Sequence, residues 1–439
     1  MRLGATISFN KIMRKLFTIA GFLLCGTGMM AQLNQQQKAQ QVQLNTITTA
    51  VPFLMIAPDS RSSGMGDAGL GLSSDANALH WNPSKIAFGE DDFQISLAYA
   101  PWLRDLVPDM NLAYLAMYGK LNKKQAIGGS LRYFSLGDIT FTDENGQTIR
   151  TFNPNELALD FTFAQQLADQ WSGGVSARYI YSNLTGGTNV GGVDSKAGQS
   201  FAVDISMLYF NDKAKLGKRD LDIRAGFNIS NVGAKMAYTE TADRDFLPTN
   251  LKLGSGFTLH LDDYNELTWA IDFNKLLVPT PPVYATDENG LPIKDSEGNY
   301  VIQSGKDPNV GPAQGIVQSF YDAPGVQLYD DQNEFIGVES GSIFKEEMSE
   351  INISTGFEYW YAKQFAVRAG YFYEAPTKGN RQFITLGVGV RYNIFTLDFS
   401  YLIATTQRNP LANTLRFTLM FTFDDMKGSS KSVDPSDVD

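Results

Sequence analysis

The sequence predicts an all-β protein, a 14-stranded antiparallel transmembrane β-barrel with a small N-terminal plug or periplasmic segment. Three observations lead to this prediction. The chain starts with an export signal, and no later apolar stretch is long enough for a transmembrane helix. From residue 92 onward, segments of about ten residues alternate apolar and polar side chains, as tilted β-strands do when they cross a bilayer.

Composition excludes several classes of function. The 439 residues carry a net charge of -11, and 12% of them are aromatic but only 19% charged, so neither general disorder nor nucleic-acid binding is expected. The single cysteine, Cys25, and the two histidines, His80 and His260, offer no thiol, zinc or His-rich metal chemistry. Neither histidine is spaced to form a catalytic Ser–His pair. We therefore predict no catalytic, cofactor-binding or metal-binding residues.

Residues 1–31 are predicted to be a secretory signal peptide. Two basic residues follow Met13, an apolar run comes next, and small residues end at Ala31, where cleavage is expected. The run is shorter than the roughly 20 residues of a membrane-spanning helix, which argues against a retained anchor. Removing residues 1–31 takes away four basic and no acidic groups, so the mature chain carries -15. An exported protein of this kind is either a soluble envelope protein or an outer-membrane barrel.

Two segments precede the predicted strands. Residues 32–51 begin with seven glutamines in twelve residues, which is typical of a polar, flexible linker. Residues 52–91 are dense in glycine and small side chains, which permit close approach of backbones. No Gly-Lys-Ser/Thr follows, so a nucleotide loop is excluded. We expect residues 52–91 to form a compact plug inside the barrel or across its periplasmic mouth.

Fourteen strands are predicted between residues 92 and 424, followed by an acidic tail over 425–439. An even number brings both chain ends to the same side, as in single-chain bacterial barrels. The connections alternate strictly between short turns and longer loops, the outer-membrane pattern of periplasmic turns and extracellular loops. The predicted strands cover 92–101, 111–119, 125–136, 156–166, 171–184, 199–211, 218–231, 250–262, 265–275, 349–361, 364–374, 380–392, 393–404 and 412–424.

The alternation also predicts which side chains face lipid and which face the lumen. In the segment 395–403, large apolar side chains such as Leu397 alternate with Thr396, Asp398 and Ser400. A soluble β-sandwich alternates too, but its wet face rarely opposes so uniformly large and aromatic a set. Buried charges must pair or stay hydrated, so the inward set predicts a lumen with ion pairs or water. This set comprises Arg178, Asp204, Arg224, Asp272, Arg368, Arg391 and Asp398.

The longest predicted loop covers residues 276–348, on the extracellular side. Its 73 residues include twelve acidic and three basic ones, giving a charge of -9. Loops of this length are usually functional or disordered. Aromatic side chains make it our candidate for contacting protein partners, and a lid over the barrel is the alternative. The candidate contact residues are Tyr284, Tyr300, Phe320, Tyr321, Tyr329 and Phe335.

Two motifs in the plug segment carry a family resemblance. The run from Arg61 to Gly69 and the run from Asn77 to Ser84, followed by the fourteen-strand pattern, resemble the FadL-like (long-chain fatty-acid transporter) barrel superfamily. Within it, residues 52–61 and the closing strands from 386 to 423 are similar to the PorV (LptO) family, the outer-membrane shuttle proteins of the type IX secretion system of Bacteroidetes. The motif residues are Arg61, Gly64, Met65, Gly66, Asp67, Gly69, Asn77, Trp81, Asn82 and Pro83.

The resemblance implies a non-enzymatic protein of the bacterial outer membrane. Proteins of this family bind the C-terminal signal domain of secreted cargo at a large outer-membrane translocon barrel. They then deliver the cargo to a surface attachment complex, in which a sortase-like peptidase exchanges that domain for a lipopolysaccharide anchor. Membrane lipid is the remaining expected contact, and nucleic acid is not expected. A FadL-type channel for hydrophobic small molecules is the first alternative and a structural or adhesive barrel the second; the charged lumen disfavours the channel.

Overall fold

The computed structural model describes residues 44–423, apart from 104–108, 143–144, 188, 191–192, 240–243, 333, 406–410 and 412. The predicted signal peptide, the first part of the predicted linker and the C-terminal tail lie outside the described residues. From Asn45 onward the chain is one compact unit. None of the helices in the described ranges is long and apolar enough to cross a membrane.

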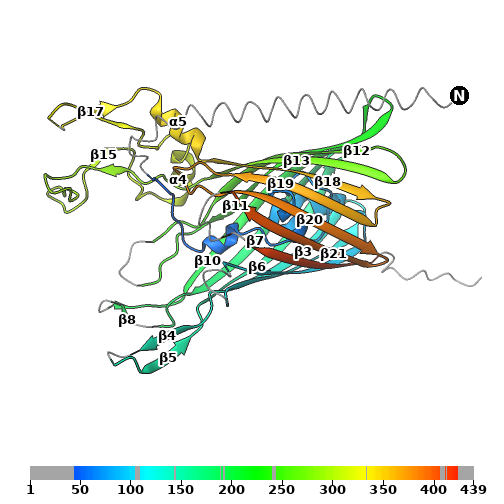
Figure 1. The fold of residues 1–439 in the computed structure, drawn as a ribbon, viewed down its shortest axis with the longest axis horizontal. Coiled ribbons are helices and arrows are strands. Elements are labelled where there is room, and N and C mark those ends of the chain that lie inside the picture. Colours follow the sequence, from blue (N-terminus) through cyan, green and yellow to red (C-terminus); the bar gives the residue numbers. More distant parts are fainter. Residues whose placement is uncertain are drawn as a thin grey trace, which may run out of the picture. The chain divides into compact units, whose positions relative to one another are not determined.

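Fourteen antiparallel strands close into a barrel (Figure 1), which confirms the predicted fold class. The ring is closed by pairing of the first strand with the last, with Phe93 opposite Phe423. The strands are β1 (Phe93–Pro101), β2 (Asn111–Asn122), β3 (Gln125–Ser135), β6 (Asn155–Ala168), β7 (Trp171–Asn183), β10 (Gly198–Leu216), β11 (Arg219–Gly233), β12 (Asn250–His260), β13 (Asn265–Leu276), β18 (Ile351–Tyr361), β19 (Phe365–Tyr373), β20 (Gln382–Tyr392), β21 (Phe395–Ala404) and β22 (Leu415–Phe423).

One strand is clearly longer than predicted. β10 continues to Leu216, beyond its predicted end at 211, because a register shift between Asn211 and Ala214 lets the pairing with β11 resume. Such a bulge interrupts the alternation, and the interruption resembles a turn in the sequence. The turn itself consists of Gly217 and Lys218, with Gly217 at a φ of 68°.

The two ends of the barrel differ. Tight turns join the strands at one end of the barrel, which is called the short-turn end below. The other connections lie at the opposite end, which is called the long-loop end. Two small hairpins project there, β4 (Ile139–Thr142) with β5 (Thr148–Phe152), and β8 (Asn189–Val190) with β9 (Val193–Asp194). The connection from β13 to β18 is largely structured. It contains β14 (Val283–Tyr284), β15 (Ile302–Ser304), α4 (Pro312–Gln318), β16 (Gln327–Tyr329), β17 (Phe335–Val338) and α5 (Ser342–Ser349), and its hairpins extend beyond the barrel at the left of Figure 1.

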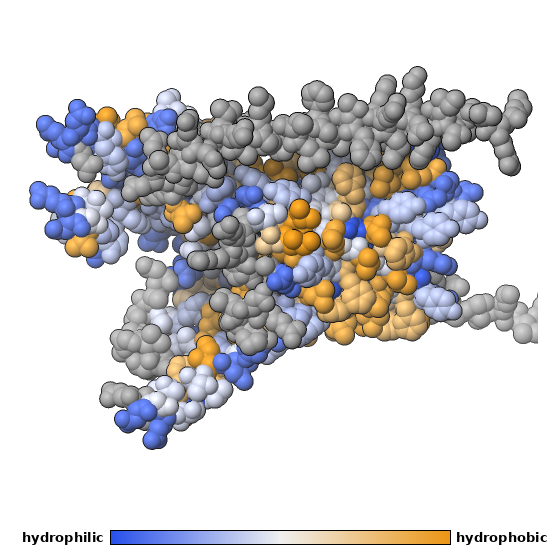
Figure 2. Space-filling view, viewed as in Figure 1, coloured by the Kyte–Doolittle hydropathy of each residue, from blue (hydrophilic) through white to orange (hydrophobic). Residues whose placement is uncertain are grey.

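The outer wall is apolar and the inner wall polar. Apolar side chains gather over the strands, whereas the hairpins of the long-loop end are mostly hydrophilic (Figure 2). On the outside, Trp269 stacks between Phe257 and Phe357, with ring centroids 5.6 and 6.5 Å away. Buried serine, threonine and charged residues occupy the alternate positions. This distribution matches a barrel wall surrounded by lipid.

The inside–outside assignment predicts an asymmetric response to charge. Leu386 lies at the centre of β20 and is 48% exposed on the outer face, whereas Thr396 is buried on the inner face. We expect Leu386→Arg to destabilise the barrel by about 2–4 kcal/mol, because an arginine near the bilayer midplane is costly. Thr396→Arg, whose side chain enters a polar cavity of the lumen, should cost much less. Unfolding titrations in lipid vesicles measure both, and equal losses would contradict the assignment.

Candidate functional site

The segment before β1 runs through the lumen from the long-loop end. Asn45 donates its backbone N–H to the carbonyl of Thr377 at 3.0 Å, and Ala50 donates to Phe246 at 2.9 Å. Both acceptors lie in connections of the long-loop end. The chain then forms η1 (Pro52–Met55), α2 (Ser60–Ser63), α3 (Ala78–Trp81) and η2 (Pro83–Phe88), and reaches β1 at the short-turn end. Residues 45–91 are called the plug below. This segment is longer than the predicted plug of residues 52–91, since Ala50 and Val51 are already buried.

Local sequence explains the short helices of the plug. Asp59 precedes α2, and its carboxylate accepts the N–H of Ser62 at 2.8 Å, which caps the helix. The same carboxylate accepts the indole N–H of Trp81 at 2.6 Å, so it also ties α2 to α3. Asn82 accepts the N–H of Ser84 and precedes Pro83, which suits the first position of η2.

Glycines let the plug touch the wall backbone to backbone. A Cβ on Gly66, whose φ is 71°, would lie 2.5 to 2.7 Å from backbone atoms of Tyr371 on β19. A Cβ on Gly64 would lie 3.2 Å from the Cα of Gly387 on β20. A Cβ on Gly69 would overlap the indole of Trp81. These motif positions therefore need glycine for contact.

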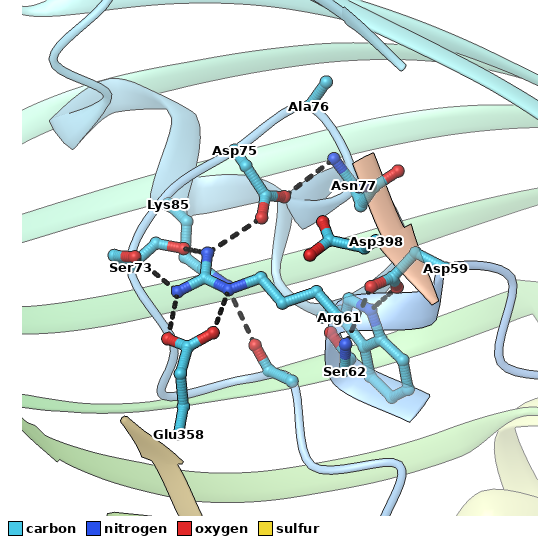
Figure 3. Close-up of polar contacts among 12 residues, drawn as sticks. Asp59, Arg61, Ser62, Ser73, Asp75, Ala76, Asn77, Lys85, Glu358 and Asp398 are labelled. Atoms are coloured by element: carbon cyan, nitrogen blue, oxygen red, sulfur yellow. Dashed lines mark hydrogen bonds and ion pairs between the residues drawn. The ribbon is translucent and has the colours of Figure 1, made fainter. Parts of the chain in front are cut away.

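Arg61 joins the plug to the wall through a buried ionic chain (Figure 3). Its guanidinium donates to both carboxylate oxygens of Glu358 on β18, at 2.9 and 2.8 Å, and to Asp75 of the plug at 2.9 Å. Glu358 also accepts from Arg368 on β19 at 2.7 Å, and Arg368 donates to Asp398 on β21 at 2.6 Å. The five side chains alternate in charge from the plug across three strands.

Asp272 binds backbone groups of the plug. The carboxylate, on β13, accepts the N–H groups of Gly69 at 2.9 Å and of Leu70 at 3.0 Å. Lys85 fixes the same turn from within the plug, because its ammonium donates to the carbonyl of Gly69 at 2.8 Å. Together with the Arg61 chain, these contacts attach the motif of residues 61–69 to one side of the wall, from β13 through β18 and β19 to β21.

The remaining predicted lumen charges also face inward. Arg178 pairs with Asp160 at 2.6 Å and with Asp204 at 3.0 Å, and it hydrogen-bonds Asn231. Arg224 pairs with Asp222 at 3.1 Å. Arg391 lies near the short-turn end, exposed, with its guanidinium 4.8 Å from the centre of the Trp360 ring.

Several partners were missed by the sequence analysis. Glu358 occupies the inward phase of β18 and could have been found from the alternation that identified Arg368. Asp59 and Asp75 lie in an irregular segment, where no period indicates which side chains are buried. Arg132 of β3 donates to the carbonyl of Leu54 at 2.7 Å, and no neighbouring charge in the sequence suggested this role.

Cavities lie on opposite sides of the plug. One of about 120 Å³ opens towards the long-loop end, and its lining includes Trp81, Asn228 and Lys252. Another of about 360 Å³ opens towards the short-turn end, and its lining includes Arg61 and Glu358. The two share no lining residue. The plug therefore separates them.

Buried ion pairs fix the base of the loop between β13 and β18. Lys275 at the end of β13 binds Glu347 at 3.0 Å and Glu350 at 2.6 Å. Lys378 of the neighbouring loop binds Glu346 at 2.7 Å and Glu350 at 3.0 Å. Helix α5, which carries Glu346 and Glu347, is thereby held against the barrel rim.

The six aromatic candidates of this loop lie in three places. Tyr284 and Tyr300 pair in the first hairpin, with ring centroids 5.4 Å apart. Tyr329 and Phe335 pair across the second hairpin at 6.1 Å. The last two follow α4 and are each 50% exposed: Phe320 and Tyr321.

A buried carboxyl group at the base of the loop between β13 and β18 should make the closure of this loop on the barrel depend on pH. Burial raises the pKa of Asp322 to about 6, while one oxygen accepts the N–H of Thr280 at 3.1 Å and the other has no hydrogen-bond partner. The closed loop thus binds more protons than an opened loop between about pH 4 and 6, so closure weakens as pH rises through this window. Asp322→Asn should stabilise closure at pH 7.5 by at most about 3 kcal/mol and by little at pH 4. Hydrogen exchange of the two proteins, compared at each pH, measures this; an equal difference at both would contradict it.

The family model described as type IX secretion system protein PorV matches residues 37–283, more than half of the chain. The chain belongs to the PorV family. Membership makes it a type IX secretion system protein, whose partners belong to the secretion machinery. With its closed barrel and lipid-facing wall, this PorV-family chain is an outer-membrane protein. Barrels of this membrane place short turns in the periplasm and longer loops outside, so we expect the long-loop end to be extracellular and the short-turn end to be periplasmic.

Solved structures with similar barrels include transporters. The chain is similar to the toluene transporter TodX of P. putida, with a TM-score of 0.47 and 11% identity over 87% of this chain and 100% of that chain. It is also similar to the toluene transporter TbuX of Ralstonia pickettii, with a TM-score of 0.41 and 12% identity over 83% and 98% of the two chains. A third is a Pseudomonas aeruginosa FadL homologue, with a TM-score of 0.39 and 11% identity over 87% and 99%. No curated protein matches the sequence.

Proposed function

We propose that this barrel binds the C-terminal signal domain of secreted cargo at the large translocon barrel and delivers it to the surface attachment complex with its sortase-like peptidase. The protein itself catalyses no step. The observation that carries the proposal is the combination of a plugged lumen with a structured, acidic loop at the extracellular end. Cargo would be handled on the outside of the barrel, after it has crossed the membrane elsewhere.

The plug supports the proposal that cargo is bound at the cell surface and does not pass through the lumen. The Arg61 chain and the Asp272 contacts bind the plug to β13, β18, β19 and β21. Opening a path wide enough for a polypeptide would break these buried pairs, each of which is costly to leave unpartnered. The same ion pairs disfavour the alternative function, a channel for hydrophobic small molecules.

The loop between β13 and β18 supports recognition of a folded partner. Its ion-paired base holds α5 at the rim, so the hairpins are presented on a fixed support. Exposed aromatic side chains provide anchors of the kind that dominate binding energy at interfaces. The charge of -9 would steer a partner with a basic face.

The test removes the hairpins and keeps the base. One variant replaces residues 286–300 with a short Gly/Ser linker, and a second replaces 328–337. Shortening a loop changes closure entropy by only about 0.6 kcal/mol per halving, so both barrels should fold and remain heat-modifiable. We expect loss of cargo co-purification and of surface attachment. The control replaces residues 140–151, the β4–β5 hairpin at the same end. Normal cargo binding by both of these variants would place the contact in another extracellular loop.

A further inference from the structure

The rim of the short-turn end carries its positive charge on one side. Three turns that follow one another around the ring, between β2 and β11, hold seven basic and three acidic residues. They are called the basic arc below and consist of residues 120–124, 167–170 and 211–220. The other described segments of this rim hold one basic and five acidic residues. These are residues 89–92, 261–264, 362–364 and 393–394. The basic arc, with a charge of +4, is thus a local exception in an acidic chain.

The largest part of the basic arc is a hairpin that extends beyond its neighbours. Pairing of β10 with β7 ends where Tyr209 faces Trp171, and pairing of β11 with β12 ends where Leu221 faces Leu259. Residues 211–220 therefore form a two-stranded ribbon outside the closed wall. Tyr209 and Trp171 have ring centroids 5.1 Å apart, and Trp171 is 44% exposed. Such aromatic pairs are typical of the edge of the apolar wall, where the headgroups begin.

The cations of the basic arc are available to an external partner. All of them except Lys120 are exposed. Within the described part of the chain, only Lys215 of the seven lies within 4 Å of a carboxylate, at 3.4 Å from Asp220. Both side chains of that pair are exposed, so solvent and salt screen it. Neither burial nor an ion pair explains why these charges are gathered here.

Each turn of the basic arc also exposes a leucine on the side of the lipid-facing wall. Leu121, Leu167 and Leu216 are 48%, 59% and 61% exposed. Leu121 and Leu167 continue the outward-facing alternation of β2 and β6. Leu216 shares a face of the ribbon with Ala214, whose partner Leu221 belongs to the outer wall. Cations and apolar side chains thus occur together on all but the shortest stretch of this arc.

This combination suits a lipid surface better than a protein surface. Six of the seven cations are lysines, a residue type that is depleted at protein–protein interfaces. A lysine side chain can cover apolar surface with its methylene groups while its ammonium stays among polar groups. Clusters of about four to eight Lys and Arg residues beside a membrane attract anionic lipids. The leucines would meet acyl chains just below the headgroups that the cations meet.

We propose that the basic arc binds the headgroups of anionic phospholipids in the leaflet next to the short-turn end, which is expected to be the periplasmic leaflet. The ammonium groups and the guanidinium of Arg219 would contact the lipid phosphates. Because the rest of the rim is acidic, anionic lipids would gather on one side of the barrel only. The site is independent of the proposed cargo function, since the loop between β13 and β18 lies at the opposite end of the barrel.

Native mass spectrometry of the purified full-length barrel tests the proposal by measuring which lipids the protein retains. Phosphatidylglycerol, which is anionic, is compared at low salt with phosphatidylcholine of the same acyl chains. We expect several-fold higher retention of phosphatidylglycerol, and loss of the preference in about 0.5 M salt, where exposed charges are screened. Equal retention of the two lipids would overturn the proposal.

Glycerol phosphate distinguishes a lipid site from a site for free phosphate compounds. It carries the phosphate of the headgroup without acyl chains. We expect no retention of glycerol phosphate at millimolar concentration, because the leucines would have no acyl chain to contact. Retention equal to that of phosphatidylglycerol would overturn the assignment to lipid.

A charge-neutralising variant tests whether the basic arc is responsible. Lys124→Gln, Lys218→Gln and Arg219→Gln together should lower the preference for phosphatidylglycerol by about ten-fold or more. The matched control removes the same charge from the loop between β13 and β18 and should leave the preference unchanged. It combines Lys294→Gln, Lys306→Gln and Lys345→Gln. An unchanged preference in the first variant, or an equal fall in the control, would overturn the proposal.

A second variant should increase lipid binding, which damage to the fold would not do. Asp220→Asn removes the carboxylate beside Lys215 and should raise the preference for phosphatidylglycerol by about two-fold to five-fold. No increase would contradict the electrostatic account. If the charge-neutralised variant kept its lipid preference but lost surface attachment of cargo in cells, the basic arc would be a protein contact and the lipid assignment would be wrong.

Discussion

Glu358→Leu should unseat the plug and destabilise the barrel by about 3–5 kcal/mol. The substitution keeps a side chain of similar volume but leaves two buried cations, Arg61 and Arg368, without the carboxylate that both of them bind. Glu358 is 1% exposed, so water cannot replace it at low cost. We expect a lower unfolding midpoint in denaturant and a rise in single-channel conductance as the plug loosens.

A matched comparison isolates the burial of the pair. Lys215 and Asp220 form an ion pair at 3.4 Å near the periplasmic end, with side chains 66% and 64% exposed. Asp220→Leu should therefore change stability by less than about 1 kcal/mol. If Glu358→Leu behaved like this surface variant, the plug would not depend on the ionic chain.

Gly66→Val should be the second most damaging change. The added side chain would begin 2.5 Å from the backbone of Tyr371, and backbone atoms of a closed barrel cannot move aside as a flexible side chain can. The positive φ of 71° adds strain of about 1–2 kcal/mol for a residue with a Cβ. We expect loss of the heat-modifiable form, or a barrel with a displaced plug and increased conductance.

Gly217→Val controls for the backbone strain alone. Gly217 has a φ of 68°, and a Cβ placed there would meet no atom within 4 Å. It should therefore lose only the contribution from the dihedral angle. The difference between the two glycine variants measures the close contact between plug and wall. A negligible difference would show that the plug can shift to accept a side chain at position 66.

The sequence predicted the wall better than the plug contacts, for physical reasons. A strand alternates with a fixed period of two, so Arg178, Arg368 and Asp398 could be assigned to the lumen from their neighbours alone. The plug has no period, so its motif indicated close packing at Gly66 but not the pairing of Arg61 with Glu358, 297 residues later in the chain. That pairing depends on how the plug is oriented inside the closed ring.

The loop between β13 and β18 shows the same limit. Its length, charge and aromatic residues were visible in the sequence, whereas its fixed base was not. Lys275 was assigned only as the end of a strand, yet it holds Glu347 and Glu350 from more than seventy residues away in the chain. Such long-range pairs form only once the barrel brings strand ends together, and no local pattern encodes them.

The path of the plug constrains the order of assembly. The chain enters the lumen beside Thr377 at the extracellular rim and leaves it at the periplasmic rim, where β1 begins. A finished cylinder filled with interlocking side chains would leave no passage through which to draw this segment. We therefore expect residues 45–91 to settle against the curved, still open sheet first. The pairing of β1 with β22 would then close the barrel around them, so the last hydrogen bonds formed in the wall are those that retain the plug.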